Sequence, residues 1–242
     1  KNYVVPIEDV RDSGLVKDRI VLAPAAVQGE VTADTTFVRL AVQKTLEFEQ
    51  RWDAYAAQQG EAPVKPALVV QLPDERSDDG EFLELVRAVI DAITQEWPGL
   101  VASNIVHTFA ERAPIDLGSH RAVRYMPPQD IQDATVVLAK NAITTGWDCP
   151  RAEVLVSLRA SVDYTPIAQL IGRIVRQPLA RRIASDESLN RVQAYLPRFD
   201  RNTVMQVVGQ FAGGEAGATA EVVRLTLDYR APSGMEAALK VL

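Results

Sequence analysis

Residues 165–176 have the residue types and spacing to act on a phosphate group. Four polar or small residues at i, i+3, i+4 and i+7 share one face of a predicted helix: Gln169, Gly172, Arg173 and Arg176. Apolar residues at 170, 171, 174 and 175 form the other face, which can pack against a sheet. Two arginines on a rigid helix suit the stabilisation of a phosphoryl group during transfer. Taken alone, however, this segment fits a helix with two surface arginines better.

Residues 142–150 offer a complementary set of groups between two predicted strands. Thr144 and Thr145 supply hydroxyls and amides, Gly146 permits a tight turn, and Asp148 supplies a carboxylate. We expect this loop at the carboxyl end of a strand, where α/β proteins bind ligands. The two segments together, with one predicted strand between them, are more specific than either one alone.

Other catalytic motifs are missing from the sequence. It contains neither the phosphate loop G-x-x-x-x-G-K-[ST] nor G-x-G-x-x-G. The acidic pair Asp74-Glu75 follows a predicted strand, but helix capping explains it better than magnesium binding. There is no G-x-S-x-G elbow, and Cys149 has only two possible histidine partners, so a nucleophilic hydrolase is not expected.

Composition limits the classes of protein further. The 242 residues include 47% hydrophobic and 24% charged residues, which is ordinary for a globular protein, and the net charge of −6 excludes a histone-like nucleic-acid coat. Eight arginines and no lysine lie between residues 159 and 201, which leaves room for a local basic groove. One cysteine excludes a disulfide framework and a structural zinc site. No apolar stretch approaches the ~18 residues of a membrane span, so we expect a cytoplasmic protein without a membrane partner.

The hydrophobic pattern predicts an α/β fold. Strands are expected at residues 3–5, 20–22, 67–72, 101–106, 122–125, 134–139, 154–158 and 221–227, and helices at 35–59, 82–93, 165–176 and 203–211. This order predicts a parallel sheet with helices on both faces. Trp147 is expected to pack in the core rather than stack on a base, whereas Arg181 and Arg182 fit phosphate contact and solvation equally well.

These segments resemble a known family. Gly146-Trp147-Asp148-Cys149-Pro150 and residues 169–176 resemble motifs V and VI of superfamily two helicases and translocases. The first is most similar to DEAD/DEAH-type proteins grouped with the restriction (helicase) subunit of type III restriction enzymes. Residues 8–17 resemble the segment that joins the two lobes in that group, and residues 66–75 lie where motif IV would be. The close resemblance covers residues 66–178.

The resemblance implies a RecA-like lobe, the second of a larger ATPase, with ATP and Mg²⁺ held mainly by a first lobe that this sequence lacks. It implies a connecting segment at 1–25, the lobe at 26–212 and a strand-containing extension at 213–242. Residues 178–201 match no standard motif of the family. The implied partners are nucleic acid, with DNA favoured, the first lobe of the same polypeptide, and a methyltransferase or nuclease subunit.

The resemblance also implies individual roles. Arg176 would be the arginine finger toward the γ-phosphate, with Arg173 beside it, and Gln169 would face the phosphate or the attacking water. Asp148 would reach the ribose or a catalytic water, and Gly146 and Gly172 would shape the ATP site. Thr144 and Thr145 would lie near the nucleic-acid backbone. The function implied is that of a helicase or translocase motor lobe, inactive in isolation, within a restriction or DNA-processing enzyme. Two alternatives remain: a non-catalytic RecA-like adaptor that binds protein or nucleic acid, and an α/β domain that binds a small molecule.

Overall fold

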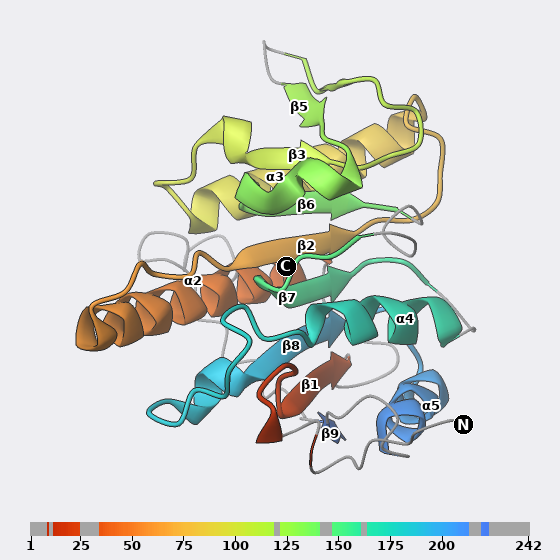
Figure 1. Ribbon diagram of the computed structural model, residues 1–242. Coiled ribbons are helices and arrows are strands. Elements are labelled where there is room, and N and C mark those ends of the chain that lie inside the picture. The colour runs from red at the N-terminus through yellow and green to blue at the C-terminus, as the bar shows by residue number, and fades with distance from the viewer. Residues whose placement is uncertain are drawn as a thin grey trace, which may run out of the picture.

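The structure is a computed structural model that describes residues 9, 12–24, 34–118, 122–140, 147–160, 164–212 and 219–222. The described strands form one nine-stranded sheet in the order β4-β5-β3-β6-β2-β7-β8-β1-β9 (Figure 1). The strands are β1 (Arg19–Pro24), β2 (Ala67–Gln71), β3 (Ile105–His107), β4 (Ile115–Asp116), β5 (Ala122–Tyr125), β6 (Val136–Ala139), β7 (Ala152–Ser157), β8 (Arg191–Leu196) and β9 (Thr219–Val222). Among them, only β4 and β5 pair antiparallel.

Helices cover both faces of this sheet. They are α2 (Asp34–Gln59), α3 (Gly80–Glu96), α4 (Thr165–Ile174) and α5 (Arg201–Ala212). On the central strand β2, Leu68 and Val70 belong to the core formed with α2 and α3, whereas Val69 belongs to the core formed with α4 and α5. Because successive side chains on a strand point to opposite faces, this division places the two helix pairs on opposite sides. The predicted α/β fold with a mainly parallel sheet is therefore confirmed.

Helix α3 shows how local sequence sets an element. Its buried side chains lie at helical spacing along one face: Phe82, Val86, Val89, Ile90, Ala92 and Ile93. Asp79 caps the amino end, and its side chain accepts hydrogen bonds from the Glu81 and Phe82 N–H groups at 2.9 and 3.1 Å. Helix capping was predicted for the acidic pair Asp74-Glu75 of the same loop, but Asp79 supplies the cap instead.

Strand β8 was not predicted. It lies between β7 and β1, well inside the sheet, and residues 192–196 are all buried. The short strand β4 and the 3-10 helices η1 (Ala102–Asn104), η2 (Pro128–Asp133) and η4 (Glu187–Asn190) were also missed. Residues 178–201, which match no family motif, thus contribute a strand of the sheet.

Both ends of the described chain enter the sheet. β1 comes from the predicted connecting segment and pairs with β8, while β9 comes from the predicted extension and pairs with β1. The expected strand at residues 3–5 and residues 223–227 of the expected last strand lie outside the described residues. Among the described helices, none has the length and apolar character needed to cross a membrane.

Candidate functional site

Helix α4 buries its apolar face and leaves the polar face accessible. The side chains that pack into the core are Ile167, Ala168, Leu170, Ile171 and Ile174. On the other side, Gln169 is exposed and Arg173 is half-buried. The amphipathic helix predicted here is therefore present, and it ends two residues before the exposed Arg176.

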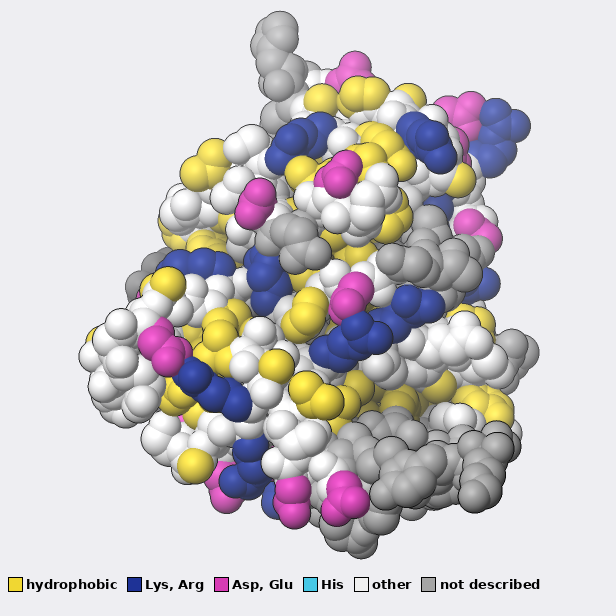
Figure 2. Space-filling model, in the orientation of Figure 1, with side chains coloured by type: hydrophobic (Ala, Val, Ile, Leu, Met, Phe, Trp, Pro, Cys, Tyr) yellow, Lys and Arg dark blue, Asp and Glu magenta, His cyan; other side chains and the backbone are white. Residues whose placement is uncertain are grey.

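The structure brings the ends of the two predicted segments together. The Arg176 guanidinium donates to Asp148 Oδ2 at 2.5 Å, and these side chains are 57% and 54% exposed. The Arg173 guanidinium donates to the Trp147 carbonyl oxygen at 2.9 Å. Arg173 therefore contacts Trp147 and Arg176 contacts Asp148, and these are the first described residues after 141–146. Basic side chains form a strip near α4 with an acidic side chain beside it (Figure 2).

This meeting point lies at the amino edge of the parallel sheet. Asp148 shortly precedes β7, and Arg176 forms an isolated bridge with Val16, which precedes β1. The whole loop at 142–150 was expected at a carboxyl strand end, and for its described part, residues 147–150, that expectation is wrong. The chain has by then returned to the opposite edge in order to enter β7 in the parallel direction.

Three predicted site residues, Thr144, Thr145 and Gly146, lie outside the described residues. Gly172 is described, and a Cβ added there would meet no heavy atom within 4 Å. The close approach expected at Gly172 is therefore not made to the described part of this chain.

Trp147 and Cys149 flank Asp148 and are both buried. Trp147 is 1% exposed and belongs to the core beneath α4, so the prediction that it packs rather than stacks on a base is confirmed. Burial raises the pKa of the Cys149 thiol. A neutral, buried thiol agrees with the sequence argument against a cysteine nucleophile.

The two arginines left open by the sequence each contact an acidic side chain. Arg181 forms an ion pair with Glu61 and lies 5.8 Å from the centre of the Tyr55 ring. Arg182 donates from Nε to Asp18 at 2.8 Å. These contacts fix the loop after α4 to α2 and to the segment before β1.

A groove of about 710 Å³ opens next to the arginine site. Its lining includes Trp97, Arg151, Pro150 and Pro178. The two prolines lie two residues beyond Asp148 and Arg176 in the chain. The groove therefore adjoins the site without including either of its charged residues.

A second polar cluster, which the sequence analysis missed, lies at the carboxyl edge of the sheet. Lys140 follows β6 directly, is 5% exposed, donates to Ser77 Oγ at 3.0 Å and lies 4.5 Å from the centre of the Phe82 ring. His107 at the end of β3 is buried, and burial lowers its pKa to about 4. A lysine directly after an apolar strand was the available clue. Lys140 immediately precedes the undescribed residues 141–146.

The residues present can be compared with what ATP and Mg²⁺ require. The accessible Arg176 guanidinium has the charge and fork geometry to contact a phosphate, and Asp148 can accept hydrogen bonds from ribose hydroxyls. The described part of the chain holds no group of three or more His, Cys, Asp or Glu side chains placed for a metal. Arg176 and Asp148 thus fit a nucleotide contact made from one side.

Comparison with known proteins gives only distant matches. No family model matches the chain, and no curated protein matches it. Solved helicase structures resemble it. S. cerevisiae Dbp5 bound to Gle1 and IP6 shares 12% identity at a TM-score of 0.41, over 86% of this chain and 42% of that one.

Two restriction enzymes resemble the chain to a similar degree. A fragment of the putative HsdR subunit of a type I restriction enzyme from Vibrio vulnificus shares 15% identity at a TM-score of 0.41, over 88% of this chain and 38% of that chain. The ATP-dependent type ISP enzyme LlaBIII bound to DNA shares 15% identity at a TM-score of 0.43, over 96% of this chain and 17% of that chain. The chain spans less than half the length of each of these three proteins. TM-scores this low carry no functional conclusion.

Proposed function

We propose that this chain is the second RecA-like lobe of an ATP-dependent nucleic-acid helicase or translocase, in which Arg176 acts as the arginine finger. The observation that carries the proposal is the convergence of Arg173 and Arg176 on residues 147–148 at one edge of a parallel sheet. The motif resemblance, which rests on the sequence alone, also assigns both segments to one nucleotide site.

The two arginines are suited to different tasks. Arg173 is half-buried and donates to a backbone carbonyl, so its role is to fix the loop that carries Asp148. Arg176 is exposed and pairs with one carboxylate. An exposed ion pair of this kind is worth only ~0–1 kcal/mol. Arg176 can therefore exchange Asp148 for a phosphate oxygen at small cost.

ATP supplies the phosphoryl group that is transferred, and Mg²⁺ neutralises part of its charge. In this proposal a first lobe binds both, and this chain contributes groups from the other side of the cleft. Arg176 stabilises charge on the γ-phosphate, Gln169 orients the attacking water, and Asp148 accepts from the ribose. Gly172 leaves space for the nucleotide, and Gly146 shapes the neighbouring loop.

In this proposal, nucleic acid would be bound by the segment that carries Thr144 and Thr145. These two residues lie in the sequence between Lys140, which follows β6 directly, and Trp147. Their hydroxyls and amides suit contacts to the phosphate backbone, which carry no base specificity.

The proposal predicts a large catalytic defect for Arg176→Ala in the full-length protein that contains this chain. kcat for ATP hydrolysis should fall on the order of 10³-fold, as it does when other arginine fingers are lost. The KM for ATP should change less, because the finger acts mainly in the transition state. Arg176→Lys should be nearly as damaging, since an ammonium lacks the planar fork. Arg76→Ala is the matched control, because Arg76 is an exposed arginine paired with Asp78 in the loop before α3.

The 242-residue chain alone should show no appreciable ATP hydrolysis, because its sequence has no phosphate loop. A wild-type rate in Arg176→Ala, with nucleic-acid binding retained, would favour the non-catalytic adaptor instead. Turnover by the isolated chain that persists through further purification would contradict the one-sided site.

A further inference from the structure

Residues 14–18, called the strap below, lie against the end of α4 although they precede β1 in the chain. Val16 and Arg176 form an antiparallel bridge. Two backbone hydrogen bonds complete it, from the Lys17 N–H to the Val175 carbonyl oxygen at 2.6 Å and from the Gln177 N–H to the Leu15 carbonyl oxygen at 2.9 Å. Both neighbours of Arg176 are therefore bonded to the strap.

Arg176 lies outside the backbone hydrogen-bond pattern of α4. α4 ends at Ile174, and the last backbone bond of the helical pattern runs from the Val175 N–H to the Ile171 carbonyl oxygen. Arg176 thus lies two residues beyond the end of the helix, and the strap supplies the backbone contacts on its two sides.

A buried ion pair fixes the strap. Lys17 Nζ donates to Glu153 Oε1 of β7, and both side chains are 0% exposed. Glu153 Oε2 accepts from the Trp52 indole N–H of α2 at 2.6 Å. Taking an ion pair out of water is costly, and such pairs are weak evidence for stability. What this pair supplies is a defined position for Lys17, one residue from the bridge to Arg176.

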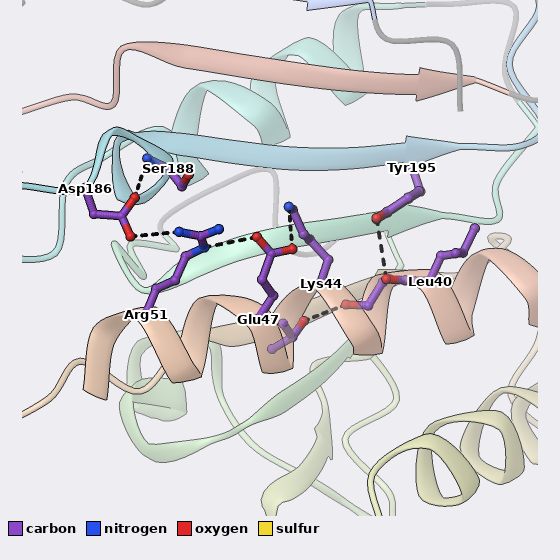
Figure 3. Close-up of polar contacts among 9 residues, drawn as sticks. Leu40, Lys44, Glu47, Arg51, Asp186, Ser188 and Tyr195 are labelled. Atoms are coloured by element: carbon purple, nitrogen blue, oxygen red, sulfur yellow. Dashed lines mark hydrogen bonds and ion pairs between the residues drawn. The ribbon is translucent and has the colours of Figure 1, made fainter. Parts of the chain in front are cut away.

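The same network reaches Arg176 from its other side. The Leu189 carbonyl oxygen accepts from Lys17 Nζ at 3.5 Å and from Gln177 Nε2 at 3.3 Å. Leu189 belongs to η4, whose cap Asp186 accepts from the Ser188 N–H and from Arg51 of α2, each at 2.9 Å (Figure 3). The side chains of Lys17 and Gln177 therefore donate hydrogen bonds to the same backbone carbonyl group.

Gly14 allows the strap to enter this position. It has a φ of +67°, and a Cβ there would lie 2.2 Å from the Arg182 nitrogen. Only glycine tolerates this combination of backbone conformation and contact.

We propose that Lys17 is a positioning residue for Arg176: its buried ion pair with Glu153 fixes the strap, and the strap fixes the backbone on both sides of Arg176. The inference rests on the proposed function, because it assigns Lys17 to the same catalytic site. It also gives the segment that would join the two lobes a direct mechanical connection to the arginine finger.

The test compares two variants of the 242-residue chain by amide hydrogen exchange. The double variant Lys17→Met with Glu153→Gln removes the ion pair without leaving a buried unpaired charge, and it keeps an acceptor for Trp52. Trp52→Phe is the control, because it removes a hydrogen bond to Glu153 but leaves the Lys17–Glu153 pair. In the double variant, protection of the Lys17 and Gln177 amides should fall about tenfold relative to the sheet amides, as for one lost buried hydrogen bond. In Trp52→Phe that ratio should not change.

The same variants can then be assayed in the full-length protein. The double variant should lose about 10²-fold in kcat, the cost of misplacing a catalytic group by roughly 1 Å, with an unchanged KM for ATP. Trp52→Phe should keep its kcat. Gly14→Ala offers a second route, since it displaces the strap while leaving both charges in place, and it should reproduce the exchange result.

Unchanged protection of the Lys17 and Gln177 amides in both strap variants would overturn the positioning role. So would a fall in kcat as large in Trp52→Phe as in the double variant. If instead Arg176→Ala hydrolyses ATP normally while the strap variants lose amide protection, the proposed function fails and the strap's hold on Arg176 stands.

Discussion

Arg173 and Arg176 lie three residues apart in one motif, but they differ in exposure and in hydrogen-bond partner. Spacing predicted both as phosphate contacts, and the family resemblance singled out Arg176 as the finger. The structure gives Arg173 a backbone carbonyl and partial burial, and gives Arg176 an exposed carboxylate. Arg176 can change partner without breaking a contact that fixes the loop, which supports the role proposed for it.

Gly172, which directly precedes Arg173 in α4, carries a prediction that separates stability from function. Gly172→Ala should raise the free energy of unfolding by up to about 1 kcal/mol, because the site is an open helix position where alanine is the better helix former. In the full-length protein it should also raise the KM for ATP, since the new methyl group faces the proposed nucleotide.

Gly209→Ala in α5 is the matched control, because Gly209 is also helical with no heavy atom near an added Cβ. Urea unfolding should show both variants stabilised, and only Gly172→Ala should alter the ATPase. An equal effect of the two on ATP hydrolysis would remove Gly172 from the site.

His107 makes stability depend on pH. Burial lowers its pKa to about 4 in the folded chain, against about 6.5 for an exposed histidine in the unfolded chain. The unfolded state therefore binds the proton first, and folding free energy is lost as the pH falls from about 6.5 toward 4. The loss from this group should be on the order of 3 kcal/mol at most. Urea unfolding at several pH values should show this slope, and His107→Asn should flatten it. An identical slope in the variant would mean that other groups cause it.

At the scale of elements, the sequence predicted best where one strong pattern decides the structure. The compact apolar run at residues 67–72 identified β2, and helical spacing identified α3. β8 was missed although Val192, Ala194 and Leu196 alternate as a strand requires. Gln193 interrupts this apolar pattern and Arg191 precedes it, but Gln193 is buried because β7 and β1 flank the strand. Polar residues inside a sheet depend on neighbours that only the fold provides.

The cap of α3 allows the contribution of one helix end to the free energy of unfolding to be measured. Asp79→Ala should lower the free energy of unfolding by ~1 kcal/mol, because the Glu81 and Phe82 N–H groups lose their acceptor. Asp78→Ala is the control, since the adjacent Asp78 is exposed and pairs only locally with Arg76. Chemical denaturation should show a loss for the first variant and little change for the second. Equal losses would mean that general negative charge, not the cap, stabilises the helix.

For the molecule as a whole, the sequence indicated which segments form the candidate site but not what fixes them. Lys17 and Glu153 are 136 positions apart and form no local pattern, and nothing in the sequence links Trp52 to either of them. A buried lysine and glutamate can be recognised only when the fold shows that neither reaches water. The same holds for the edge of the sheet on which Asp148 lies, since parallel strands return each loop to the edge where the next strand begins.

Charge across the whole chain sets the last prediction, the strength of nucleic-acid binding by the chain alone. With a net charge of −6, attraction to nucleic acid must be local, and we place it at the segment that carries Thr144 and Thr145. Few phosphates would be contacted, so we expect a Kd of about 10⁻⁴ to 10⁻⁶ M at physiological salt, weakened by added salt and insensitive to sequence.

Thr145→Glu should weaken binding further by setting a carboxylate against a phosphate. Gln58→Glu adds the same charge at the exposed end of α2, near the amino edge, and should have little effect. Fluorescence anisotropy with single- and double-stranded oligonucleotides at two salt concentrations measures all of these effects. Binding that is sequence-specific or indifferent to salt, or that responds equally to both variants, would place the nucleic-acid surface elsewhere.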